Sequence, residues 1–167
     1  MHDRVPIQDA APLTREIYQP RGSTALLDAI GRTIDTIVRA HAATPEPEHP
    51  SKVIIAILTD GEENSSRKFS MADVNQRITH QTEKFEWEFL FLGANQDAIA
   101  TAANMGIHAH NSATFVADAA DVQASSIAIS DKVAAKRRQA AACNLSIAES
   151  TAAKESMGQS LKKSRRQ

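Results

Sequence analysis

Apolar residues along the chain follow spacings that predict both helices and buried strands. Between residues 24 and 42 they recur every three or four positions, which predicts an amphipathic helix. Residues 53–58 form an uninterrupted apolar run rich in β-branched side chains, which indicates a strand buried on both faces of a parallel sheet. Residues 85–92 carry an aromatic side chain at every second position, so they predict a second strand with an aromatic face.

The remaining elements are marked by capping residues and short apolar runs. A second helix is predicted to begin after Ser70, a good N-cap residue. A third helix is predicted to end near Gly106, which suits the left-handed position after a helix. Residues 113–116 predict a short last strand, and residues 119–138 predict a helix that docks on the domain. Because helices and strands alternate, the sequence indicates a layered α/β fold.

Composition divides the chain into three parts. Residues 1–118 form the α/β domain, residues 119–138 its C-terminal docking helix, and residues 139–167 a basic, Ala- and Ser-rich tail that is expected to be helical or disordered. The chain holds 19 basic and 20 acidic residues, but residues 131–167 alone hold nine of the basic and three of the acidic ones. An acidic body argues against a nucleic-acid-binding core. Nucleic acid is expected only through the basic tail, whose last cluster, Lys162–Arg166, otherwise reads as a solvated chain end.

Cysteine content and hydropathy bear on the compartment. Cys143 is the single cysteine, so no internal disulfide can form and a reducing compartment is the simplest setting. The first residues lack the apolar region of a secretory signal, and the longest apolar run is far shorter than a membrane span. We therefore expect a cytoplasmic protein that does not bind membranes.

The loop after the 53–58 strand holds the main candidate chemistry. Ligands collect beyond the carboxyl ends of the strands in open parallel sheets. Asp60, Glu62 and Glu63 offer hard oxygen donors there, which suit Mg²⁺; the alternative is a solvated turn that Asp60 caps. Thr24 offers either a hydroxyl ligand or an N-cap for the helix that follows it.

Other motifs carry weaker signals. His108-x-His110 could form half of a metal site, but no Cys or third His lies nearby in the sequence, so surface histidines are the simpler interpretation. Arg21-Gly22-Ser23 resembles an anion-holding turn but lacks the glycine spacing and the lysine of a P-loop. Cys143 has no adjacent base. The aromatic face of 85–92 favours a core role over base stacking, since few basic residues interleave with it.

Several segments together resemble a von Willebrand factor type A domain of the bacterial and phage intracellular kind. The resemblance rests on residues 21–30, 59–61, 61–69 and 91–98. It implies a doubly wound, Rossmann-like α/β fold with a metal-ion-dependent adhesion site, built from an Asp-x-Ser-x-Ser motif after the first strand, then a threonine, then an aspartate. By this resemblance Thr24 matches the threonine and Asp60 matches the aspartate.

The chain departs from the family pattern at its N-terminal end. It contains no Asp-x-Ser-x-Ser, and residues 1–20 hold no apolar strand to carry one. The sequence therefore reads as an N-terminally truncated type A fold with a C-terminal helical tail. Thr24 and Asp60 alone should hold Mg²⁺ or Mn²⁺ weakly or not at all, since such cations take about six oxygen ligands. The 53–58 strand would also be left with an open, apolar edge.

These features predict a non-enzymatic protein-interaction module with an incomplete metal-ion-dependent adhesion site. Thr24 and Asp60 are the candidate metal ligands, and Ser23, Glu62 and Asn64 are candidate partner contacts. The partner is expected to be a protein that binds through an acidic side chain at the metal site or through the open sheet edge. One alternative is a metal-free structural fragment that complements another chain through that edge. A Mg²⁺-dependent phosphohydrolase using the Asp60 loop is the other, although it lacks a second carboxylate cluster and a nucleophile–base pair.

Overall fold

The computed structural model describes residues 5–12, 14, 16, 22–94, 97–141 and 154–166. Its centre is a three-stranded parallel sheet in the order β1 (Ile54–Thr59), β2 (Glu88–Ala94) and β3 (Ser112–Phe115). The helices are α1 (Leu26–Ala42), α2 (Met71–Phe85), α3 (Ala98–Asn104), α4 (Ala119–Ala141) and α6 (Met157–Ser164). Short 3-10 turns lie at Ile7–Asp9 (η1), Glu46–Glu48 (η2) and Ala109–Asn111 (η3). The predicted mixed α/β class is confirmed.

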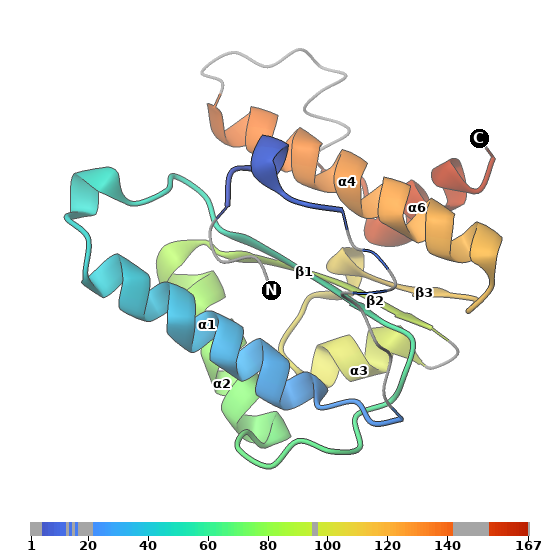
Figure 1. Ribbon diagram of the computed structural model, residues 1–167, viewed down its shortest axis with the longest axis horizontal. Coiled ribbons are helices and arrows are strands. Elements are labelled where there is room, and N and C mark those ends of the chain that lie inside the picture. Colours follow the sequence, from blue (N-terminus) through green and yellow to red (C-terminus); the bar gives the residue numbers. More distant parts are fainter. Residues whose placement is uncertain are drawn as a thin grey trace.

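Helices cover both faces of the sheet, as Figure 1 shows, with α1, α2 and α3 on one side and α4 and α6 on the other. The central strand β2 supplies both cores because its side chains alternate between the faces. Phe89 and Phe91 face the first core, where they pack with Ile34 of α1 and Ile78 of α2. The second core lies between the sheet and the other two helices, and its members include Leu90, Leu92, Phe115, Ala128, Met157 and Leu161.

The local signals for α2 and for the end of α3 hold. The Ser70 side chain accepts a hydrogen bond from the Asp73 N–H, and the Asp73 side chain accepts one from the Ser70 N–H, so a capping box starts α2. Gly106 follows α3 with φ of 83°, the left-handed conformation that glycine adopts without strain.

The aromatic strand begins later than the alternation predicts. Phe85 ends α2 and is 60% exposed, so the prediction that it starts a strand is wrong. Glu86 then takes a left-handed conformation with φ of 54°, which ends the helix before β2 begins at Glu88. The helix therefore extends through the first residue of the aromatic pattern.

Strand β1 is buried on one face and only partly covered on the other. Ile55 and Ile57 are buried in the first core, whereas Ala56 is exposed and Leu58 is 45% exposed on the opposite face. The prediction of burial on both faces is therefore wrong: Ile54 packs against the second core at the start of β1, but Ala56 and Leu58 further along the same face remain exposed. Among the described strands, β1 pairs only with β2, so it forms the edge of the sheet. None of the described helices has the length and apolar character needed to cross a bilayer.

Candidate functional site

The predicted site residues lie at the carboxyl end of β1. Asp60 directly follows β1 and is exposed, and Thr24 lies just before α1. The Thr24 hydroxyl oxygen lies 2.7 Å from the position that a Cβ on Gly61 would occupy. The structure thus brings Thr24 against the loop that Asp60 begins, and a side chain at position 61 would require the Thr24 hydroxyl to shift.

Asn64 fastens the two loops together. Its side-chain oxygen accepts a hydrogen bond from the Thr24 N–H at 2.9 Å, and its own N–H donates to the Thr24 carbonyl at 3.1 Å. The amide of Asn64 is thereby engaged within the chain. Ser23 and Glu62, the other predicted partner contacts, are exposed beside this junction.

Glu63 has a structural role at this site. Its carboxylate accepts hydrogen bonds from the N–H groups of Leu27 (2.9 Å), Ser65 (3.0 Å) and Ser66 (2.7 Å), and from the Ser66 hydroxyl (2.8 Å). Burial acts to raise the pKa of this carboxyl, but the hydrogen bonds from Leu27 and Ser66 outweigh it and lower the pKa. Glu63 is therefore a distant cap for α1, and its oxygens are already occupied by donors.

Of the two roles considered for Thr24, that of N-cap for α1 is wrong. The N-cap position falls on Ala25, whose side chain makes no capping hydrogen bond. The first N–H groups of the helix instead reach the 63–66 loop, where Glu63 accepts from Leu27 and the Ser66 hydroxyl accepts from Asp28 at 2.9 Å. The Thr24 hydroxyl therefore does not cap the N-terminus of α1.

Asp28 of α1 also accepts hydrogen bonds from backbone N–H groups of the loop. Its buried carboxylate accepts hydrogen bonds from the N–H groups of Arg67 (3.2 Å), Lys68 (2.8 Å) and Phe69 (3.0 Å). Burial acts to raise the pKa of Asp28, and the three backbone donors together with Arg32 lower it below its usual range. Sequence reasoning missed this residue, whose one signal is an acidic side chain in the first turn of an otherwise apolar helix start.

The donors present do not amount to a complete cation site. Thr24 offers a hydroxyl against the Gly61 position and Asp60 offers a carboxylate at the neighbouring position of the loop, but Glu63 is engaged elsewhere. In the part of the chain that the structure describes, no three His, Cys, Asp or Glu side chains are arranged to hold a metal ion. A cation that takes about six oxygens would need most of its ligands from water or from another molecule.

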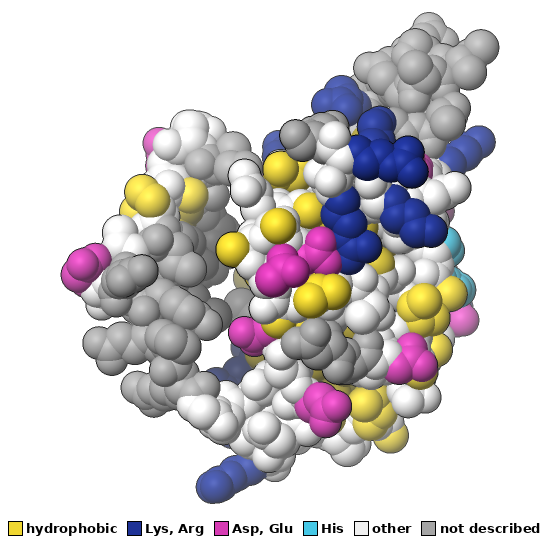
Figure 2. Space-filling view, turned by 90° about the vertical axis from the view of Figure 1, so that its right-hand side faces the viewer, with side chains coloured by type: hydrophobic (Ala, Val, Ile, Leu, Met, Phe, Trp, Pro, Cys, Tyr) yellow, Lys and Arg dark blue, Asp and Glu magenta, His cyan; other side chains and the backbone are white. Residues whose placement is uncertain are grey.

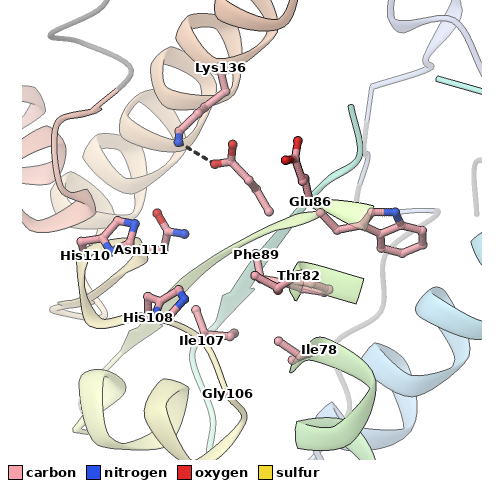
Figure 3. A pocket seen from close by; sticks show the side chains of 12 residues that line it. Ile78, Thr82, Glu86, Phe89, Gly106, Ile107, His108, His110, Asn111 and Lys136 are labelled. Atoms are coloured by element: carbon pink, nitrogen blue, oxygen red, sulfur yellow. Dashed lines mark ion pairs between the residues drawn. The ribbon is translucent and has the colours of Figure 1, made fainter. Parts of the chain in front are cut away.

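A pocket lies at the opposite end of the sheet, where β2 begins (Figure 3). This pocket of about 250 Å³ is lined by polar groups that include Glu88 and Lys136, over an apolar floor that includes Ile107. The Glu88 carboxylate pairs with Lys136 of α4 at 2.6 Å and with Lys52 at 2.9 Å. Burial acts to raise the pKa of Glu88, and the two ammonium groups lower it. The pair therefore joins α4 to the sheet.

His108 and His110 sit at the rim of this pocket. Their rings stack with centroids 5.6 Å apart, and both residues are exposed. Burial of the His110 ring, with the nearby His108, lowers the pKa of His110. Among the described residues, no group of three His, Cys, Asp or Glu side chains that could hold a metal ion includes them. Arg21 and Cys143, which the sequence also singled out, lie outside the described residues.

Comparison with protein-family models, with curated proteins and with solved structures found no match. The resemblance to a type A domain therefore rests on the sequence motifs.

Proposed function

We propose that this chain is a non-enzymatic protein-interaction module, similar to a type A domain with an incomplete metal-ion-dependent adhesion site, and that it binds its partner along β1. The observation that carries the proposal is the exposure of a strand whose sequence is typical of full burial. Leu58 is 45% exposed and Ala56 is exposed on the same face of β1, and none of the described strands pairs with the outer edge.

An exposed apolar edge strand favours completion by another polypeptide. Its unpaired N–H and C=O groups are a template for an added strand. Its exposed apolar side chains offer further surface that such a strand, or a helix following it, would bury. Monomeric proteins usually protect such edges with charges, prolines or bulges. β1 has none of these between Ile54 and Thr59, which supports a partner at this edge.

The loop at the end of β1 extends the same surface. Glu62 and Ser23 are exposed beside Asp60, so a partner seated on the β1 edge would meet these polar groups at its rim. An apolar centre with a polar rim is the usual anatomy of a protein interface. Asn64 would contribute less than the sequence suggested, because its amide already holds Thr24.

Site-specific crosslinking tests this proposal. A photo-crosslinking amino acid replaces Leu58, and in a second variant it replaces Ile99 of α3, which is 48% exposed and away from the β1 edge. We expect one defined crosslinked protein segment from position 58 and none from position 99. The purified complex should then slow hydrogen exchange of the β1 amides, because their outer edge becomes paired. Equal crosslinking from both positions, or a crosslinked segment that leaves β1 exchange unchanged, contradicts the proposal.

A cation at Thr24 and Asp60 is a second candidate feature, favoured by the contact of the Thr24 hydroxyl with the Asp60–Gly61 loop. An acidic side chain of the partner would then complete the coordination. For the chain alone we expect Mg²⁺ and Mn²⁺ to bind more weakly than about 1 mM by titration calorimetry, because two donors leave most of the ligand shell to water. Micromolar binding that disappears in Asp60→Ala would mean that the site is complete without a partner.

A further inference from the structure

The layer formed by α4 and α6 presents a basic surface of its own. Figure 2 shows Lys and Arg side chains gathered on one face of the molecule. We use the name basic face for the four exposed cations Arg138, Lys162, Lys163 and Arg166. The first comes from α4 and the others from α6 and the residues after it, so the packing of the two helices creates the surface.

Two shallow hollows bring these cations together. Arg138 and Lys163 line a hollow of about 190 Å³, with Asp131 and Glu155 among its other residues. Lys163 also lines a hollow of about 450 Å³ together with the remaining two cations of the basic face, with Glu155 again at its wall. The hollows therefore share Lys163, and the cations outnumber the carboxylates that line the same surface.

The cations of the basic face are available for an external anion. In the described part of the chain, no carboxylate forms an ion pair with any of them. Their neighbours differ in this respect, because Arg165 donates to the Asp121 carboxylate at 2.7 Å and Lys136 pairs with Glu88 at 2.6 Å. Arg165 and Lys136 thus hold parts of the fold together, whereas the cations of the basic face are exposed to solvent.

We propose that the basic face binds the phosphate backbone of a nucleic acid without reading its sequence. Phosphate contacts through Lys and Arg supply affinity without base recognition. A membrane surface fits less well, because the apolar residues of α6, Met157 and Leu161, are buried in the second core and leave nothing to insert. A protein partner fits less well too, since α6 exposes no large apolar side chain that could anchor an interface.

Fluorescence anisotropy of the full chain with a short labelled oligonucleotide tests the proposal. If each of the four cations neutralises one phosphate, raising NaCl from about 50 to about 200 mM should weaken binding roughly 50- to 150-fold, regardless of base sequence. The double variant Lys163→Gln/Arg166→Gln should reduce the slope of log affinity against log salt by about 2. The matched control, Arg39→Gln/Lys84→Gln, removes two exposed cations from α1 and α2 and should leave the slope unchanged.

Three results would overturn the proposal. One is the lack of binding to single-stranded or duplex oligonucleotides at low salt. Another is an equal loss of affinity in the control variant, which would trace binding to net charge alone. The third is binding to phosphatidylserine vesicles in the absence of nucleic-acid binding. Circular dichroism melting of both variants checks that the exposed substitutions leave the fold intact.

Discussion

At the scale of single residues, two neighbouring glutamates of the 60–69 loop have opposite roles. Glu63 receives hydrogen bonds from three N–H groups and one hydroxyl, whereas Glu62 is exposed beside it. We expect Glu63→Ala to lower the free energy of unfolding by about 1–2 kcal/mol, the range measured for lost helix N-caps. Glu62→Ala removes the same charge from the same loop and should stay within about 0.5 kcal/mol of the parent.

Urea unfolding followed by circular dichroism measures both variants. The contrast separates a specific cap from a general effect of charge, because the two changes alter net charge equally. Equal destabilisation by the two substitutions would show that Glu63 does not hold α1.

The sequence could predict where these side chains gather but not what each does. Strand polarity alone put Asp60 at the carboxyl end of the sheet, and the resemblance brought in Thr24. The roles of Glu63 and Asp28 depend on contacts that are distant in the sequence. Leu27 and Glu63 are 36 positions apart, and Asp28 and Phe69 are 41 positions apart. No local pattern encodes such pairings, so a cap supplied by a distant loop reads in the sequence as a free carboxylate.

At the scale of elements, two helical glycines test how closely the helices pack. A Cβ on Gly31 of α1 would lie 2.6 Å from the Phe69 ring, which the Arg77 guanidinium covers at 4.8 Å, whereas a Cβ on Gly158 of α6 would meet nothing within 4 Å. We expect Gly158→Ala to raise the free energy of unfolding by up to about 1 kcal/mol through helix propensity. Gly31→Ala should lower it by about 1–3 kcal/mol, because the overlap outweighs that gain.

Thermal or urea unfolding of the two variants checks the opposite signs. Since the same atoms are added to a helix in both, propensity cancels in the comparison and the packing of Phe69 on α1 remains. A stabilised Gly31→Ala protein would mean that Phe69 moves aside at little cost.

The elements match the prediction where the signal is local, and they depart from it where packing against another element determines the structure. The Ser70 cap and the glycine at 106 carry their own geometry, so α2 begins and α3 ends as predicted. Phe85 is different, because helix α2 includes this first residue of a pattern that predicts a strand. The exposed face of β1 is the other case, since periodicity cannot say whether a covering helix is present.

At the scale of the whole molecule, carboxylates join elements that lie far apart in the sequence. Asp28 and Glu63 link α1 to the 60–69 loop, Glu88 links β2 to α4 through Lys136, and Asp121 links α4 to the chain after α6 through Arg165. Hydrogen bonds or ion pairs lower the pKa of all four, against the opposing effect of burial. Acid should therefore weaken several of these long-range contacts at once.

The direction of this pH dependence follows from linkage. A carboxyl whose pKa is lower in the folded state contributes stability that is present above its unfolded pKa, about 4, and lost as the pH falls through the folded value. We therefore expect the free energy of unfolding to fall steeply below about pH 4. A shallower decline should begin near pH 6.5, because burial lowers the pKa of His41 and of His110 and the unfolded chain protonates first.

The variant Asp28→Asn tests whether the contact between α1 and the 60–69 loop contributes to the loss of stability in acid. The amide has one oxygen to offer the Lys68 and Phe69 N–H groups, so the variant should be less stable than the parent at pH 7. It also lacks a group that titrates, so its stability should fall less than that of the parent between about pH 5 and pH 3. Urea unfolding of both proteins across this range measures the two slopes. If the slopes coincide, Asp28 is not a source of the acid sensitivity, and the α1 contact with the 60–69 loop does not depend on its charge.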